Sequence, residues 1–385
     1  MRVLFLALPV DERARAACVC RSWRAFLTDT SLWQVLDLTP AGGVAAERLT
    51  GDLVQGAVAR AAGSLRVFRL NDVPMRNGEA LASVVDTFEF HGAALEEVST
   101  DVSLDDNELP AIFAAAPRLQ VLNADIECPC EVLVPMLRNE APYGALRVRK
   151  LVVWYRSLEA APVLALAAAV ASHESLTRLE VERVDFAPGL NALVDAAAER
   201  RVSSLFIHDI CRCDAETVRA ITRLLQRGSL TTLRLDCAGF PRAPEASVVE
   251  LCAALRACHT LTHLRLLIDP LVGADRHTLT ELMDAAAALP VLSDLNLLGS
   301  EMQDVVAFGH AVGALLAANP PSLHTLSVSF CHLGDEGLGP LLDGLAANTH
   351  LRRLDCDAND PSDAFERNRL RPAMAALAAR ADLDE

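Results

Sequence analysis

One apolar frame recurs along almost the whole sequence and restricts the possible fold more than any other feature. In this frame, Leu-x-x-Leu-x-Leu, apolar residues stand at the first, fourth and sixth places with few exceptions. The twelve frames begin at Trp33, Leu65, Leu95, Leu119, Val148, Leu176, Val202, Leu230, Leu261, Leu292, Leu323 and Leu351. Their mean spacing is about 29 residues, a period that indicates a stack of similar units.

Each unit is expected to contain one short strand and one helix. Alternation within the frame predicts a parallel strand with its marked side chains in the core. The segments between frames predict outer helices, of which Arg219–Leu225 shows the clearest helical spacing, with Asp214 as N-cap and Gly228 as its end. Capping-box spacing at Ser247–Glu250 and Thr278–Glu281 predicts two further helix starts.

The frames resemble the longer-repeat, ribonuclease-inhibitor-like class of leucine-rich repeats over about residues 33 to 360. The closest agreement runs from Leu323 to Gly337, where Cys331 stands at a place that family members fill with Asn or Cys. The resemblance implies that this side chain bonds backbone groups inside the turn. It also implies an α/β horseshoe solenoid with a concave parallel sheet and convex helices. The frames at Leu95 and Leu119 depart from the pattern and predict an irregular stretch.

The sequence predicts three parts. These are a small helical cap at residues 1–32, the repeats at residues 33–360 and a C-terminal capping helix at residues 361–385. A repeat stack exposes its core at both ends and needs such caps. The apolar face expected for the last helix consists of Leu370, Ala373, Met374 and Leu377.

Residues 1–32 are similar to an F-box. The family's Leu-Pro turn, central helix and closing Leu-Trp match Leu8-Pro9, Val19-Cys20-Arg21-Ser22-Trp23 and Leu32-Trp33. In the family, this module packs against a Skp-type adaptor of cullin–RING ubiquitin ligases. The adaptor-binding residues that the resemblance implies are Leu8, Pro9, Val19, Cys20, Trp23, Leu32 and Trp33. The family's first helix precedes this segment, so the F-box here is incomplete, through truncation or through degeneration to a cap.

Composition excludes several kinds of partner and compartment. The net charge of −16 opposes binding to nucleic acid or to an anionic membrane surface. The longest apolar run, Ala160–Ala171, is too short to cross a bilayer. Eleven scattered cysteines favour a reducing compartment, so the cytoplasm, the nucleus or both are expected.

The sequence predicts neither an enzyme nor a bound metal or cofactor. Asp355–Glu366 has oxygen-bearing residues at several calcium-loop positions, but Asp360 stands where such a loop needs glycine. This segment also lies within a repeat. His259 and His263 are four apart, but they belong to different expected elements. No phosphate loop, dinucleotide motif or serine elbow is found.

Residues between the marked positions are expected on the concave face. Exposed aromatic side chains there favour recognition of a protein, since such residues dominate binding energy at interfaces. The partner-binding candidates are Lys150, Val152, Trp154, Tyr155, Phe206 and His208. The alternative is that Trp154 or Phe206 is covered by neighbouring groups.

Two main functions follow from these resemblances. The first is a substrate-recognition subunit of an SCF-type ubiquitin ligase, which binds a Skp-type adaptor and cullin complex through the F-box and an unknown protein through the repeats. The alternative is a stand-alone binding scaffold or inhibitor with a degenerate F-box cap. Activation of a small GTPase is a third and weaker hypothesis, because no arginine or asparagine is singled out for it. Lys150 is the single lysine, which would limit self-ubiquitination.

Overall fold

The computed structural model describes most of the chain, and its contacts group into two compact units. Unit 1 comprises residues 1–153 with 172–176, and unit 2 comprises residues 154–171 with 177–385. The described residues are 12–13, 15–16, 20–21, 27–39, 50–61, 63–70, 87, 92–105, 108–127, 130–140, 147–154, 160–182, 187–208, 215–236, 245–267, 276–298 and 304–381.

Unit 1 contains the first five strands, and neighbours in sequence pair in parallel. The strands are β1 (Val35–Asp37), β2 (Val67–Leu70), β3 (Glu97–Asp105), β4 (Val121–Glu127) and β5 (Arg147–Trp154). The α-helices between them are α4 (Gly51–Ala61), α6 (Glu108–Ala115) and α7 (Cys130–Leu137), and short 3₁₀ turns lie at Thr30–Trp33 and Gly92–Ala94.

Strand pairing in unit 1 is irregular where the sequence frames depart from the pattern. The register between β3 and β4 shifts between Ser99 and Ser103, and that between β4 and β5 shifts between Leu122 and Asn123. These three strands are also longer than those of unit 2. The irregularity predicted at the frames of Leu95 and Leu119 is therefore confirmed.

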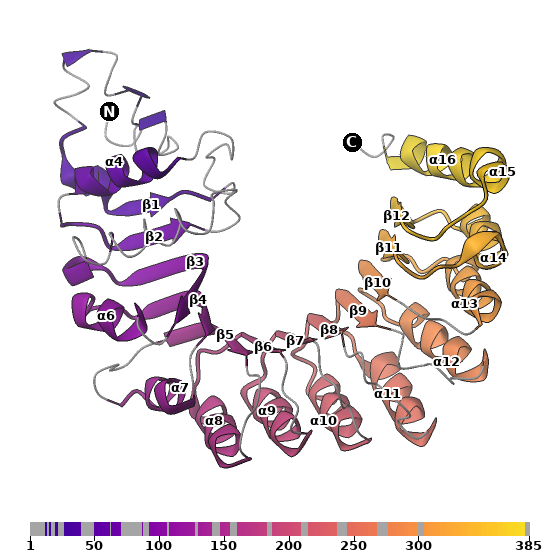
Figure 1. The fold of residues 1–385 in the computed structure, drawn as a ribbon, viewed down its shortest axis with the longest axis horizontal. Coiled ribbons are helices and arrows are strands. Elements are labelled where there is room, and N and C mark those ends of the chain that lie inside the picture. Colours follow the sequence, from indigo (N-terminus) through magenta and orange to yellow (C-terminus); the bar gives the residue numbers. More distant parts are fainter. Residues whose placement is uncertain are drawn as a thin grey trace. The chain divides into compact units, whose positions relative to one another are not determined.

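Unit 2 contains seven strands, again paired in parallel with their sequence neighbours. They are β6 (Arg178–Glu182), β7 (Ser204–His208), β8 (Thr232–Asp236), β9 (His263–Leu267), β10 (Asp294–Leu298), β11 (Thr325–Ser327) and β12 (Arg353–Asp355). The helices are α8 (Ala160–Ser172), α9 (Ala187–Arg200), α10 (Ala215–Gln226), α11 (Glu245–Ala257), α12 (Arg276–Ala287), α13 (Val305–Ala317) and α14 (Gly334–Ala347). Helices α9 to α14 follow one side of these strands (Figure 1).

The marked apolar residues form the core, as the frames predict. One leucine from each of β6 to β10 lies in the same register row, and all five are almost fully buried: Leu179, Leu205, Leu233, Leu264 and Leu295. Burial of such a side chain contributes about 1.5–3 kcal/mol to the free energy of folding. The described residues form a strand at every one of the twelve frames.

The predicted helix ends are confirmed in one case and wrong in two. Helix α10 covers the predicted Arg219–Leu225, and Gly228 follows it with a φ of 65°, which glycine adopts without strain. Helices α11 and α12 begin at Glu245 and Arg276, two residues before the predicted capping boxes. Ser247 is itself buried in the first turns of α11.

Equivalent turns after β11 and β12 are closed by the side chains of Cys331 and Asn359. The Cys331 thiol donates to the carbonyls of Leu297 and Ser329. The Asn359 amide donates to Val328 and accepts from the Leu333 N–H, at 2.9 and 3.2 Å. The role implied for Cys331 is confirmed.

Asn359 also bears on the calcium loop considered for Asp355–Glu366. Its amide is buried and bonded to backbone groups, so it does not face a common centre with the carboxylates of that segment. The described residues hold no group of three side chains able to bind a metal ion.

The C-terminal segment packs on the last repeat. Ser362 caps the short helix α15 (Asp363–Phe365), a π-helical turn follows at Glu366–Leu370, and α16 spans Arg371–Ala381. Leu377 is 3% exposed, and the other three residues of the predicted apolar face are half-buried. No helix among the described residues has the length and apolar character needed to cross a membrane.

Candidate binding site on the strand face

The side of β6 to β10 that faces away from the leucine core carries rows of polar side chains. Strand side chains alternate between two faces, so the residues flanking each core leucine share this second face, here called the strand face. One row consists of Arg178, Ser204, Thr232, His263 and Asp294. The next row consists of Glu180, Phe206, Arg234, Arg265 and Asn296.

Phe206 lies between two guanidinium groups instead of being open to solvent. The Cζ atoms of Arg178 and Arg234 lie 4.0 and 4.5 Å from the centre of its ring. This leaves Phe206 5% exposed. The expectation of an exposed aromatic contact at Phe206 is therefore wrong, because the two cations stack on the ring and cover it.

His208 joins two carboxylates from neighbouring strands. Its Nε2 lies 3.2 Å from Glu180, and its Nδ1 lies 3.1 Å from Asp236. The hydrogen bonds to Asp236 and then to Glu180 raise the pKa of His208 to about 9, against the opposing effect of burial. The imidazole is therefore charged at neutral pH, and 22% of the side chain remains exposed.

Each of these carboxylates also contacts an arginine. Glu180 pairs with Arg178 at 2.9 Å, and Asp236 pairs with Arg265 at 2.9 Å. Burial favours a higher pKa for both acids, but the His208 hydrogen bonds and the arginine charges outweigh it and lower the pKa of each. The result is a continuous chain of five charged groups across β6 to β9.

A pocket of about 350 Å³ lies beside this charged chain. Its lining is Arg178, Ser204, Phe206, Thr232, Leu233, Arg234, His263, Leu264, Arg265, Asp294 and Asn296. Two buried polar atoms here have no hydrogen-bond partner, Nε of Arg178 and Oδ1 of Asn296. The guanidinium of Arg234 likewise has neither an ion pair nor a hydrogen bond among the described residues. A pocket with unused donors and acceptors is suited to a polar ligand.

The predicted contact residues of β5 give a divided result. Lys150 is half-buried. Val152 is only 7% exposed, so the prediction that it is an exposed contact residue is wrong. Val152 is an apolar strand residue, and burial is the favoured environment for it. The side chain of Trp154 and the whole of Tyr155 lie outside the described residues.

The segment that resembles an F-box packs into the first repeat at its end. Trp33 and Leu32 are 0% and 1% exposed, and the Trp33 Nε1–H donates to the Leu27 carbonyl at 2.9 Å. The nearly buried Arg13 donates to the Leu32 carbonyl at 2.8 Å. The prediction that Leu32 and Trp33 contact the adaptor directly is therefore wrong, because both side chains belong to the core of unit 1.

Of the other residues implied for adaptor binding, the structure describes Cys20. Cys20 is exposed. Leu8, Pro9, Val19 and Trp23 lie outside the described residues.

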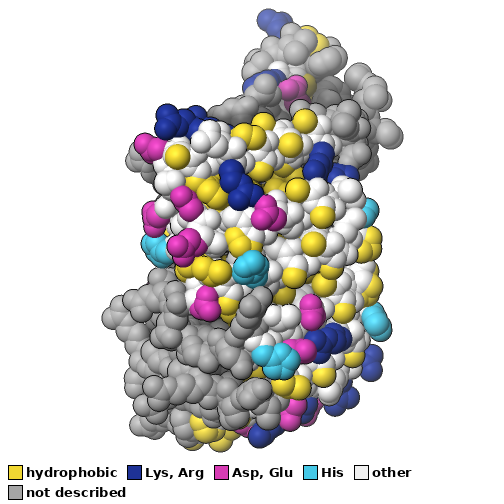
Figure 2. Space-filling view, turned by 90° about the vertical axis from the view of Figure 1, so that its right-hand side faces the viewer, with side chains coloured by type: hydrophobic (Ala, Val, Ile, Leu, Met, Phe, Trp, Pro, Cys, Tyr) yellow, Lys and Arg dark blue, Asp and Glu magenta, His cyan; other side chains and the backbone are white. Residues whose placement is uncertain are grey.

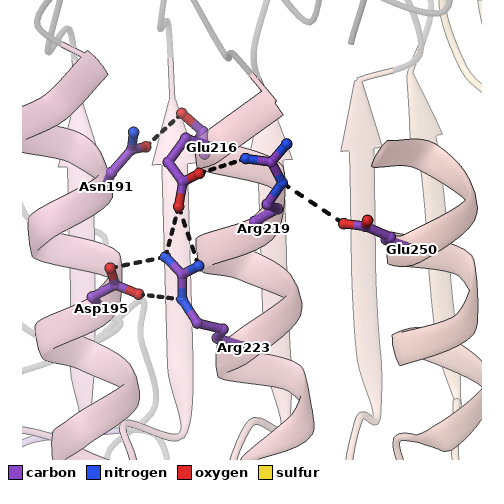
Figure 3. A network of polar contacts seen from close by, with 7 residues as sticks. Asn191, Asp195, Glu216, Arg219, Arg223 and Glu250 are labelled. Carbon is purple, nitrogen blue, oxygen red and sulfur yellow. Dashed lines mark hydrogen bonds and ion pairs between the residues drawn. The ribbon is translucent and has the colours of Figure 1, made fainter. Parts of the chain in front are cut away.

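The helix side of unit 2 carries a second polar network, which we interpret as structural. Arg223 on α10 binds Asp195 on α9 and Glu216 on its own helix, and Arg219 reaches Glu216 and Glu250 on α11 (Figure 3). These pairs are exposed, and pairs of this kind contribute about 0–1 kcal/mol each. On the side seen in Figure 2, charged and hydrophobic side chains are interspersed and form no single field.

Sequence reasoning selected Phe206 and His208 as candidates, and it placed Arg234 on the same face without selecting it or the other two arginines that complete the site. Arg178, Arg234 and Arg265 occupy flanking positions of three frames, and the parallel register places them on one face. Alignment of the flanking positions across frames would have revealed them. The unpaired state of Arg234 has no signal in the sequence.

Comparison with known proteins agrees with both parts of this architecture. Residues 4–39 match the model of the F-box-like family. No curated protein matches the chain.

Two solved structures are similar to this chain to different degrees, both at low sequence identity. A chain from the crystal structure of the Rad7 and Elc1 complex in yeast has a TM-score of 0.51 at 15% identity, covering 93% of this chain and 87% of that one. A leucine-rich repeat-containing protein, LegL7 from Legionella pneumophila, has a TM-score of 0.37 at 19% identity, covering 55% of this chain and 66% of that one. Residues 4–39 thus match an F-box-like segment, and the frames and parallel strands that follow have the fold of a leucine-rich-repeat solenoid.

Proposed function

We propose that this chain is the substrate-recognition subunit of an SCF-type cullin–RING ubiquitin ligase. The observation that carries the proposal is the F-box-like match at residues 4–39, directly followed by leucine-rich repeats. The F-box-like segment holds a Skp-type adaptor, and the strand face of the repeats holds a protein to be ubiquitinated. In this role the chain is a binding protein without catalytic residues or a cofactor, and it acts in the cytoplasm, the nucleus or both.

The two halves of this proposal have separate support. A fold like this one was solved in a two-protein complex, that of Rad7 and Elc1, which supports binding of this chain to an adaptor protein. The strand-face pocket supports protein binding, because it combines a covered aromatic ring with polar groups that lack partners. The acidic net charge of the chain argues against a nucleic acid as the partner.

Co-purification with the host's Skp-type adaptor tests the adaptor half. We expect the full chain to retain the adaptor and the double variant Leu8→Ala, Trp23→Ala to lose it. Trp33→Phe is the matched control, because Trp33 is a core residue of unit 1. It should lose stability without losing the adaptor.

Folding of each variant is checked by thermal unfolding before the adaptor is added. A folded wild-type chain that fails to retain the adaptor would contradict the proposal. It would leave the alternative function, a stand-alone binding scaffold with the F-box-like segment as its cap.

A further inference from the structure

Among the three arginines that line the strand-face pocket, Arg234 differs in having no acidic partner in the described chain. The carboxylates of Glu180 and Asp236 each contact His208 and one arginine, so Arg178 and Arg265 already have acidic partners. Arg234 stands between Phe206 and Arg265 in its row, packed on Phe206 and without an ion pair among the described residues. A partly buried cation gains more from an opposite charge than one in bulk water, so this position favours an incoming anion.

Contact with the Phe206 ring, 4.5 Å from Cζ to the ring centre, restricts the Arg234 guanidinium. Because side-chain entropy is lost when the stack forms, less remains to be lost when a ligand binds. A planar guanidinium presents paired N–H donors that match the two oxygens of a carboxylate. The amide oxygen of Asn296 and Nε of Arg178, two residues that line the same pocket, have no partners and can bond a peptide backbone.

The number of free charges selects a carboxylate over a phosphate group. Among the described residues, Arg234 is the one lining arginine without an acidic partner, which matches the single charge of an aspartate or glutamate. A phosphoserine carries about −1.5 to −2 charges. Its excess charge would be repelled by Asp294, which lines the same pocket without an ion-pair partner in the described chain.

The extent of the site suits an extended peptide. The lining runs from β6 to β10, four strand spacings or about 19 Å at about 4.8 Å each. An extended chain advances about 3.3 Å per residue, so five or six residues cover this distance.

We propose that the strand-face pocket binds an extended segment of the protein substrate and that Arg234 pairs with one aspartate or glutamate side chain of that segment. This inference rests on the proposed function for the identity of the partner as a ubiquitination substrate. The pocket then selects substrates by one acidic residue in an otherwise uncharged stretch.

Fluorescence anisotropy of the full chain with nine-residue peptide pools tests the proposal. The pools have random uncharged flanks and a fixed central residue, either glutamate, glutamine, phosphoserine or lysine. We expect the glutamate pool to bind at least tenfold more tightly than the glutamine pool and more tightly than the phosphoserine pool. Arg234→Gln should abolish the preference, and Arg234→Glu should transfer it to the lysine pool.

Two further variants serve as controls. Arg219→Gln makes the same change on the helix side and should leave the glutamate preference intact. Asp294→Asn removes the repelling carboxylate and should raise the affinity for the phosphoserine pool at least threefold. Circular dichroism verifies that each variant is folded.

The proposal is overturned if no pool binds, if glutamate and glutamine pools bind equally, if phosphoserine is preferred, or if Arg234→Gln keeps the preference. Adaptor co-purification from the same preparations separates the two proposals. A glutamate preference without adaptor binding upholds the pocket and rejects the ligase role. Adaptor binding without a glutamate preference rejects the pocket alone.

Discussion

His173 and His208 illustrate at the residue scale how surroundings decide the charge of a side chain. His173 is buried in unit 1, where Nε2 accepts from the Val148 N–H and Nδ1 contacts the Leu137 carbonyl at 2.9 Å. Burial lowers the pKa of His173 and outweighs these hydrogen bonds, so it stays neutral. His208 in unit 2 lies between two carboxylates and is charged. The two histidines therefore give stability opposite dependences on pH.

Substitution of each histidine by glutamine should reveal these opposite dependences. The pKa of His208 is raised in the folded chain. The charged imidazole therefore contributes fully to the free energy of unfolding below about pH 6.5, and this contribution disappears as the pH rises through about 9. His208→Gln should lower the free energy of unfolding by about 2 kcal/mol at pH 6 and by much less at pH 10. The cost of His173→Gln should instead shrink as the pH falls below about 6.5, because the pKa of His173 is lowered on folding.

Urea unfolding at several pH values measures these costs, with NMR titration of the two imidazoles as a direct check. Equal costs of His208→Gln at pH 6 and pH 10 would show that its imidazole does not bridge Glu180 and Asp236 as a cation.

Phe206 shows what a sequence leaves open at this scale. Its position on the strand face followed from the frame, because alternation within a strand is fixed. Its coverage depends on Arg178 and Arg234, which are 28 residues away on either side and meet the ring only through strand register. The sequence contains no pattern that predicts which neighbouring side chain a long, flexible arginine packs against.

At the scale of elements, helices α13 and α14 approach each other unusually closely. A Cβ atom added at Gly309 or Gly313 would overlap the backbone carbonyl of Gly337 or Pro340, and one at Gly344 would overlap that of Gly313. Gly339 on α14 differs, because the nearest atom to an added Cβ is the flexible Arg369 side chain at 3.6 Å. Glycine thus permits the helix contact at some positions and only weakens the helix at another.

Replacement of two of these glycines by alanine should therefore change stability in opposite directions. Gly313→Ala should lower the free energy of unfolding by about 1–3 kcal/mol, because the helices must separate to admit the methyl group. Gly339→Ala should raise it by about 0.5–1 kcal/mol, because alanine is the better helix former and has room. Chemical denaturation of both variants provides the measurement. Stabilisation by Gly313→Ala would show that the helices are not in contact there.

Strand positions were more predictable than helix starts. Buried leucines recur in every frame, so the same apolar pattern predicts a strand at each frame independently. The starts of α11 and α12 were misplaced, because Ser247 and Thr278 satisfy the capping-box pattern from inside the first turns. A local motif cannot distinguish an N-cap from a residue two places further on when both positions tolerate it.

For the whole molecule, the small number of amines limits where a ubiquitin ligase could modify its own receptor. Lys150 on β5 is the single lysine of the chain, and it is half-buried. A bound ligase therefore finds only this side-chain amine and the N-terminal amine on the receptor itself.

Self-modification of the receptor should accordingly depend on Lys150. In a reconstituted ubiquitination reaction, Lys150→Arg should remove side-chain conjugates and leave those at the N-terminal amine. Mass spectrometry of the modified chain identifies the sites, and N-terminal acetylation of the variant serves as the control. Undiminished conjugation of the acetylated variant would contradict the expectation.

The fold of the whole chain was more accessible from sequence than the site was. Twelve frames made the prediction of the solenoid independent of any one of them. Trp33 belongs both to the first frame and to the closing Leu-Trp of the F-box resemblance. Its role was predicted wrongly, because a tryptophan at the end of an adaptor-binding motif and one that opens a repeat core look the same in sequence. Burial of its ring in unit 1 decides between them.

The unbroken register from β6 to β10 also means that the strand face is a grid whose columns can be exchanged. Each strand supplies one side chain to every row, so replacement of one repeat changes a single column and leaves its neighbours aligned. Columns are about 4.8 Å apart, and positions within a column are about 6.6 Å apart. Loss or duplication of a whole repeat would shorten or lengthen the grid by one column. Such a surface can acquire a new ligand preference through recombination of repeats, without redesign of the core beneath it.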